Sequence, residues 1–167
     1  MIKDINYKVI KNFLDEDKFI KIKNIITDKD FPWYYKGNNE VEAGYFSHSL
    51  FHDNEITSTF NKILTEDIYK KLKPIAVIQA RANLLLSSLF YNKKSKWHTD
   101  YNHNNFTAIY YLNTADGGTE VKDNDEIKFI KAEKNKLLVM KSYTLHRALL
   151  SINVEKRYIL NFNYFEK

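Results

Sequence analysis

The sequence predicts an α+β fold that is mainly β, with N-terminal helices packed on one sheet. Two observations carry this prediction: helical periodicity occurs in the first part of the chain, and short strand-like segments dominate the remainder. This order is typical of α+β proteins, and many short strands favour a sandwich or a barrel. The 167 residues are expected to form a single domain, with a helical support region over 1–74 and a β core over 75–167.

Two helices are expected in the N-terminal part. The first covers residues 15–27, where Asp15 can cap the helix and the apolar positions follow a period close to 3.6 residues. The second covers residues 55–72 and ends before Pro74. Its apolar stripe consists of Ile56, Phe60, Ile63, Leu64, Ile68 and Leu72.

Strand-like segments follow from Ile75 onward. They are short and rich in β-branched, aliphatic and aromatic residues, and turn signals separate several of them. The strongest turn signal is Asp116-Gly117-Gly118. The expected strands cover residues 77–90, 105–113, 118–122, 126–131, 136–141, 145–151 and 157–165.

The composition excludes several classes of protein. Without cysteine, the chain can form neither a disulfide scaffold nor a zinc or iron–sulfur site held by thiolates. With only 4 Gly and 2 Pro, it is not a collagen-like or low-complexity chain. No apolar run approaches the roughly 20 residues of a membrane span. The first residues lack the apolar core of a signal peptide, so a cytoplasmic location is expected.

The positive charge is unevenly distributed along the chain. The formal net charge is +5, and residues 68–99 contain several Lys and Arg but no Asp or Glu. Such a run is typical of a solvated basic face. The alternative is a funnel that draws an anionic substrate or co-substrate toward a site. The segment contains no recognised nucleic-acid-binding module, so nucleic acid is not the favoured partner.

The residues that carry chemistry are His98, Asp100 and His146. Residues i and i+2 of a strand point to the same face, so His98 and Asp100 can address one point while Thr99 turns away. His146 follows a buried strand-like segment. Two His and one carboxylate form the facial triad of non-haem Fe(II) oxygenases, which leaves open metal positions for a co-substrate and O₂. The alternative is three ordinary polar residues at strand ends.

Arg157 opens the last expected strand. Its planar, permanently charged fork suits a bidentate carboxylate partner. Arg147 is the competing candidate, but it directly follows His146 on a strand, so its side chain should leave the metal face. The sequence therefore favours Arg157 as the carboxylate-binding residue.

With these residues in place, the block from Trp97 to Phe165 resembles the Fe(II)/2-oxoglutarate-dependent dioxygenase superfamily, particularly its prolyl-hydroxylase-like branch. The matching pieces are His98-Thr99-Asp100, the segments 107–113, 117–120 and 135–140, His146 and Arg157. The resemblance implies a double-stranded β-helix, or jelly roll, over 75–167. It also implies Fe(II) held by the His-Asp-His set, with 2-oxoglutarate and O₂ as co-substrates. Arg157 and Tyr111 would then bind the 5-carboxylate of 2-oxoglutarate.

Four further residues are candidate substrate contacts. Arg81 and Asn83 share one strand face, where they would contact substrate or 2-oxoglutarate; their alternative is an outward pair solvated at the sheet edge. His103 lies in a polar segment that is expected to be a loop. Asn161 has the strand parity of Arg157, and its alternative role is a structural hydrogen bond.

The leading functional hypothesis is an enzyme that hydroxylates a C–H bond and releases succinate and CO₂. A prolyl residue of a peptide or protein is the first expected substrate. A free amino acid, another small molecule or a nucleobase are the alternatives. Two other classes stay open: a non-catalytic jelly-roll binding module, and a cupin-like metalloprotein with different chemistry. The intact ligand set argues against the binding module. The cupin-like protein has no need of a 5-carboxylate clamp such as Arg157 and Tyr111 would form.

Overall fold

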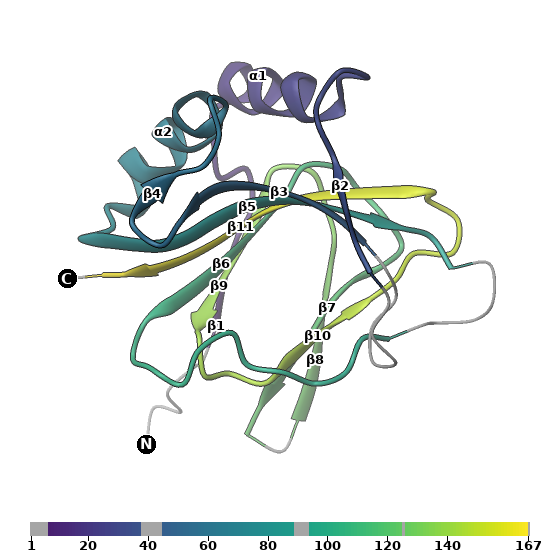
Figure 1. Ribbon diagram of the computed structural model, residues 1–167. Helices are drawn as coiled ribbons and strands as arrows, with labels where there is room; N and C mark the ends of the chain where they lie inside the picture. The colour runs from purple at the N-terminus through teal and green to yellow at the C-terminus, as the bar shows by residue number, and fades with distance from the viewer. Residues whose placement is uncertain (1–6, 38–44, 89–93, 125, 167) are drawn as a thin grey trace.

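Two antiparallel sheets face each other, and two helices cover the outer face of the larger sheet (Figure 1). The computed structural model describes residues 7–37, 45–88, 94–124 and 126–166. The helices are α1 (Glu16–Thr27) and α2 (Asn61–Leu72). The predicted α+β architecture, mainly β with the helices on one sheet, is confirmed. No helix in the described part of the chain is long and apolar enough to cross a membrane.

The larger sheet has the strand order β1-β9-β6-β11-β5-β3-β2, with β4 paired to β3 beside this path. The smaller sheet has the order β10-β7-β8. The strands of the larger sheet are β1 (Tyr7–Ile10), β2 (Tyr34–Lys36), β3 (Tyr45–His52), β4 (Glu55–Ile56), β5 (Ala76–Leu86), β6 (Phe106–Tyr111), β9 (Lys136–Lys141) and β11 (Lys156–Phe165). Those of the smaller sheet are β7 (Gly118–Asp123), β8 (Glu126–Lys131) and β10 (His146–Leu149).

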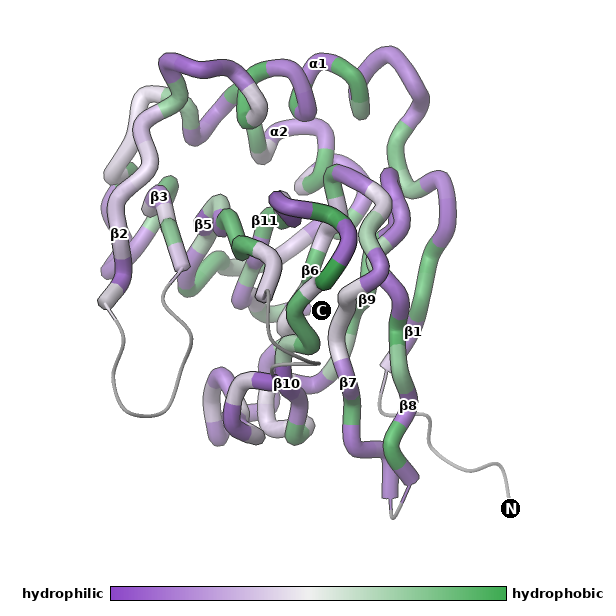
Figure 2. The backbone as a smooth tube through the Cα atoms, turned by 90° about the vertical axis from the view of Figure 1, so that its right-hand side faces the viewer, coloured by the Kyte–Doolittle hydropathy of each residue, from purple (hydrophilic) through white to green (hydrophobic). Residues whose placement is uncertain are grey.

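Alternation along the central strands divides the interior into two apolar clusters. On β11, Leu160 and Phe162 pack beneath the helices, whereas Ile159 points between the sheets. On β6, Tyr110 faces the helices and Tyr111 faces the space between the sheets. In Figure 2, hydrophobic and hydrophilic positions also alternate along both helices, which bury one side on the sheet. The inner faces of β5, β6 and β11 therefore form the floor on which a site can be built.

The boundary expected at residue 74 does not separate helices from sheet, because β1 to β4 all precede it. The second helix begins at Asn61 rather than at residue 55. Asp53 and Asn54 adopt left-handed φ values of 52° and 62°, which turns the chain into the β3–β4 hairpin. The strand expected over 77–90 ends at Leu86 in the structure, and its last two residues lie outside the described part.

Candidate metal centre and co-substrate clamp

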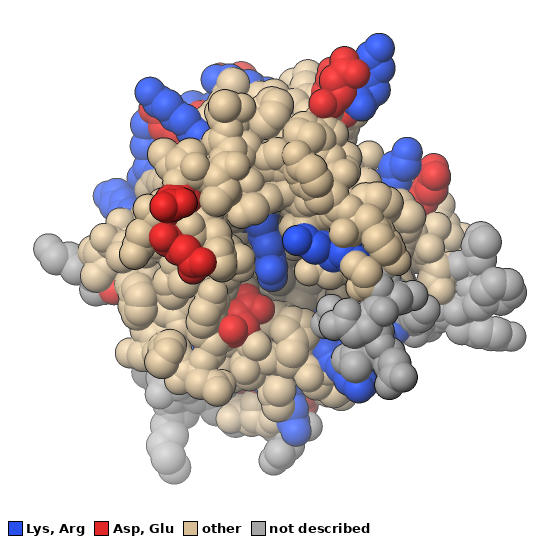
Figure 3. Space-filling view, in the orientation of Figure 1, with Lys and Arg blue, Asp and Glu red and all other residues tan. Residues whose placement is uncertain are grey.

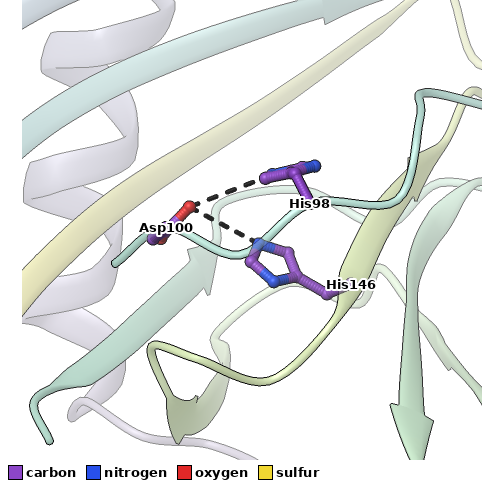
Figure 4. A group of neighbouring side chains, drawn as sticks. All are labelled: His98, Asp100 and His146. Atoms are coloured by element: carbon purple, nitrogen blue, oxygen red, sulfur yellow. Dashed lines mark ion pairs between the residues drawn. The ribbon is translucent and has the colours of Figure 1, made fainter. Parts of the chain in front are cut away.

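The backbone brings the three predicted ligands together. His98 and His146 face each other in an antiparallel bridge, where each amide N donates to the other's carbonyl O at 3.0 and 2.9 Å. Asp100 follows, and its amide N donates to the carbonyl O of Ser142 at 3.0 Å. One ligand atom from each of the three side chains lies within 4.8 Å of the other two (Figure 4). These side chains converge on a single point.

Both imidazole rings turn Nδ1 toward a backbone carbonyl and Nε2 toward Asp100. Nδ1 of His98 donates to the carbonyl O of Lys96 at 3.1 Å, and Nδ1 of His146 donates to that of Thr144 at 2.9 Å. A proton on Nδ1 leaves the lone pair on Nε2, which is the arrangement of a metal-bound histidine. The two Nε2 atoms lie 3.9 and 3.6 Å from Oδ1 of Asp100.

Asp100 is held by one oxygen and free at the other. Its Oδ2 accepts hydrogen bonds from Oγ1 of Thr107 and Nδ2 of Asn163, both at 2.8 Å. Thr107 lies on β6 and Asn163 on β11, so the floor of the sheet fixes the carboxylate. Oδ1 is left to face the two imidazoles. Sequence reasoning did not assign these supporting roles, although Asn163 shares the strand parity of Arg157 and Asn161.

The pKa shifts of Asp100 and His146 favour the binding of a cation by these side chains. Burial would raise the pKa of Asp100, but nearby His146 and the hydrogen bonds from Asn163 and Thr107 hold that pKa below its usual value. Burial lowers the pKa of His146. An ionised carboxylate and neutral imidazoles are the forms that bind a divalent metal. The donor set therefore fits Fe(II), with one carboxylate oxygen and two imidazole nitrogens turned to one point.

Arg157 lies in the same cavity as a buried cation without a carboxylate partner among the described residues. It is 2% exposed, and its Nη1 donates to the carbonyl O atoms of Gly118 and Leu149 at 3.0 and 2.7 Å. Its Nε is buried and has no hydrogen-bond partner. Burial lowers the pKa of Arg157, which marks the cost of keeping this charge away from water. An unpaired buried guanidinium of this kind fits the 5-carboxylate of 2-oxoglutarate.

Tyr111 lies on the same inner face as Arg157. Its hydroxyl donates to Oγ1 of Thr119 at 2.7 Å, and both side chains line the cavity. Burial raises the pKa of Tyr111 to about 12, so the phenol is protonated at neutral pH. The pair adds neutral hydroxyl groups beside the guanidinium, where a carboxylate would need further donors.

Arg147 is engaged elsewhere, as the strand parity predicts. Its Nε donates to Oε2 of Glu120 at 2.7 Å, and its guanidinium lies 4.2 Å above the centre of the Trp97 ring. Lys94 binds the other oxygen of Glu120 at 2.8 Å. Arg147 does not line the cavity, whereas Arg157 does.

The cavity has a volume of about 220 Å³ and contains most of the predicted substrate contacts. Arg81, Asn83 and Asn161 line it together with the three candidate metal ligands. His103 is exposed in the loop after Asp100 and does not line the cavity. In the described part of the basic segment 68–99, Arg81 is the one Lys or Arg that reaches the cavity.

Two facing sheets with a His-Asp-His cluster between them, and a buried unpaired arginine behind that cluster, define the class of non-haem Fe(II) oxygenases. Residues 86–165 match the model of the 2OG-Fe(II) oxygenase superfamily. This match confirms the resemblance stated from the sequence. No curated protein matches the chain.

Solved structures share the fold over almost the whole chain. A prolyl hydroxylase from Trichoplax adhaerens, in complex with a hypoxia inducible factor peptide fragment, is 14% identical with a TM-score of 0.74, covering 96% of this chain and 83% of that one. A Pseudomonas putida prolyl-4-hydroxylase is 13% identical with a TM-score of 0.66, covering 98% and 95%. The epimerase SnoN, in complex with Fe3+ and alpha ketoglutarate, is 12% identical with a TM-score of 0.67, covering 97% and 79%.

These findings confirm three of the predictions made from the sequence. The fold is a jelly roll with helices on one sheet. The chain is an enzyme of the non-haem Fe(II)/2-oxoglutarate-dependent class. Its cofactors are Fe(II) and 2-oxoglutarate, with O₂ as the other co-substrate.

Proposed function

We propose that this enzyme hydroxylates a C–H bond of its substrate while 2-oxoglutarate is converted to succinate and CO₂. The single observation that carries the proposal is the shared cavity. Two Nε2 atoms and one carboxylate oxygen converge at one place in it, and an unpaired buried guanidinium lies at another. The first site suits the metal and the second suits the far carboxylate of the co-substrate.

In this proposal each residue has one task. His98, Asp100 and His146 would hold Fe(II), and Arg157 with Tyr111 would hold the 5-carboxylate of 2-oxoglutarate. When bound, the metal and its co-substrates supply the oxidising power for the C–H bond, which no side chain can supply. The protein fixes the positions of the three ligands through the contacts already described and keeps the carboxylate site buried.

The first candidate substrate is a prolyl residue of a peptide or protein. Support comes from the two prolyl hydroxylase structures that share the fold, one of them in complex with a peptide fragment. A small-molecule substrate is the second candidate, because an epimerase and a carbocyclase of nogalamycin biosynthesis have the same fold. The fold alone does not choose between them, since function depends on the residues grafted onto it.

The test is anaerobic addition of Fe(II) and then 2-oxoglutarate, read by the visible charge-transfer band of the chelate. The wild-type protein should give the band and should form succinate once O₂ is admitted. His146→Ala should lose both. His103→Ala removes an exposed histidine outside the cavity and should keep the band. A folded wild-type protein without the band would contradict the proposed function.

A further inference from the structure

Arg81 is a second cation in the cavity that the proposed chemistry leaves without a partner. It lies on β5 and lines the cavity together with the candidate metal ligands. Its Nε is buried and has no hydrogen-bond partner. The charge of Arg81 helps to lower the pKa of Asp100, but the carboxylate of Asp100 forms its close pairs with the two histidines and not with Arg81. A guanidinium that is partly withdrawn from water without a counter-ion is costly, so its presence calls for an anion from outside the chain.

The charges of the loaded site do not supply that anion. Asp100 is the one carboxylate among the described residues that line the cavity. The two positive charges of Fe(II) and the charge of Arg157 balance the carboxylate of Asp100 and the two carboxylates of 2-oxoglutarate. Once these charges cancel, the positive charge of Arg81 is left without a compensating negative charge in the described lining of the cavity.

The position of Arg81 separates it from the co-substrate clamp. Arg81 lies opposite Asn161 of β11, whereas Arg157 lies opposite Leu85. Four residues along a strand span about 13 Å, so the two arginines serve different places in the cavity. Arg81 is nearer to the metal end, because Asn163, two residues beyond Asn161, is the residue that binds Asp100.

Asn161 is a polar neighbour of Arg81 in the cavity. Asn161 projects into the same cavity from the strand position opposite Arg81, and its Oδ1 is also buried without a partner. Two adjacent positions on neighbouring strands thus present unsatisfied polar atoms beside the metal ligands. Buried polar groups in folded proteins are normally paired, so these two atoms mark a place in the cavity where a ligand can bind.

Arg81 also lines a second cavity. This cavity of about 460 Å³ lies against β2, β3 and β5, and Tyr45 and Arg81 line both cavities. Besides Arg81, its basic lining residues in the described part are Lys36, His48 and His52, and no Asp or Glu is among the described lining residues. Figure 3 shows one face of the molecule, on which basic and acidic side chains border a central hollow. The described lining of this second cavity therefore carries the charges of Lys36 and Arg81 and no carboxylate.

We propose that Arg81 binds an anionic oxygen group of the substrate, a carboxylate or a phosphate, and so places the reacting C–H bond beside the metal. The inference rests on the proposed function and adds the charge of the substrate to it. Asn161 offers the anion's neighbouring atoms a second hydrogen-bonding group from the facing strand.

The test uses the anaerobic complex of the protein with Fe(II) and 2-oxoglutarate, in which Arg157 is already occupied. Calorimetry compares N-acetylproline with its neutral amide, and inorganic phosphate forms a second anionic arm. The wild-type protein should prefer an anion over the amide by about 10- to 100-fold, because charge-assisted hydrogen bonds are lost with the amide. Tighter binding of phosphate would identify a phosphate-bearing substrate, and tighter binding of N-acetylproline a carboxylate.

Three variants complete the experiment. Arg81→Gln should abolish the preference and leave the charge-transfer band with 2-oxoglutarate unchanged, whereas Arg81→Lys should keep a weaker preference. Arg147→Gln, outside the cavity, should behave as wild type. The inference fails if the wild-type complex shows no preference or binds no anion below about 10 mM. It also fails if Arg81→Gln loses affinity for 2-oxoglutarate. A wild-type protein that never forms the band would instead contradict the proposed function.

Discussion

At the scale of single residues, the candidate metal site depends on side chains that cannot touch the metal. Asn163 holds Oδ2 of Asp100 and also donates to Oγ1 of Thr107 at 2.9 Å. We expect Asn163→Leu to weaken Fe(II) binding by about 10- to 100-fold, because the carboxylate is no longer fixed. Metal titration measures the effect. Asn161→Leu is the matched control on the same strand face, and an equal loss there would contradict the assigned role.

The two arginines near the C-terminal strands give a second prediction. Arg157→Ala should weaken binding of 2-oxoglutarate by at least about 10-fold, because a buried charge-assisted contact is lost. Arg147→Ala removes a largely buried ion pair with Glu120 that lies outside the cavity lining, and it should change that affinity little. Titration of the charge-transfer band compares the two variants. The reverse order would show that the strand-parity argument is wrong.

His146 gives the apo-protein a pH dependence with a definite sign. Burial lowers its pKa in the folded state below the ordinary 6.5, so the unfolded chain binds the proton more readily. The resulting stability is complete above pH 6.5 and is lost as the pH falls through the folded-state pKa. Denaturant unfolding of metal-free protein should therefore show a falling free energy below pH 6.5. His146→Gln should flatten the slope in that window, and an unchanged slope would contradict this assignment.

At the scale of elements, the turn before β7 supports the proposed co-substrate clamp. Oδ2 of Asp116 accepts from the amide N of Ile152 and of Asn153 at 2.9 and 3.0 Å, which ties this turn to the segment before β11. A Cβ on Gly117 would lie 2.5 Å from the carbonyl O of Leu149 and 2.8 Å from Nη1 of Arg157. The absence of a side chain lets the guanidinium reach that carbonyl.

We therefore expect Gly117→Ala to weaken 2-oxoglutarate binding and to lower the thermal unfolding midpoint. The added methyl group must displace backbone on one side and the Arg157 guanidinium on the other. Gly37→Ala is the control, because a Cβ there meets no atom within 4 Å. If Gly117→Ala bound the co-substrate as wild type does, the close approach would have no part in the clamp.

The candidate ligands and the main strands can be predicted from the sequence, whereas the contacts that hold the ligands in place cannot. Local geometry alone predicts that His98 and Asp100 share a strand face. It also predicts that Arg147, which directly follows His146, points away from the face of His146. The role of Asn163 depends on where β11 and the His98 segment lie in space, which no local pattern contains. The early strands β1 to β4 were missed for a related reason. β1, β2 and β4 have two to four residues each and none of these residues is buried, so pairing with other strands defines them rather than their own periodicity. β3 is longer, with eight residues, but polar Ser and His side chains interrupt its apolar pattern.

At the scale of the whole molecule, Asn135 joins the helical layer to the sheet that carries the site. Its Oδ1 accepts from the amide N of Leu14 and the hydroxyl of Tyr110 at 2.9 and 2.7 Å, and its Nδ2 donates to the carbonyl O of Leu14 at 2.8 Å. Leu14 lies two residues before the start of α1, and Tyr110 lies on β6. This buried amide therefore fixes the N-terminal segment against the jelly roll.

Asn135→Ala should lower the free energy of unfolding by about 2–4 kcal/mol, because it leaves buried polar groups unpaired. Denaturant titration measures the change. Asn135 also has a left-handed φ of 58°, so part of the loss could reflect backbone strain. Asn124→Ala controls for this, because Asn124 has a φ of 55° but lies exposed in a turn. A similar loss at both positions would mean that the hydrogen-bond network contributes nothing.

The contact between the helical layer and the sheet also gives a test of our proposal that residues 1–167 form one domain. α1 and α2 pack on β5, β6 and β11, and the opposite faces of these strands carry Arg81, Tyr111 and Arg157. A helical layer that melted alone would expose the outer side of the strands that hold the site. We therefore expect far-UV circular dichroism and the charge-transfer band to be lost in one transition on denaturant titration. Loss of helical signal while the band persists would instead divide the chain into two cooperative units.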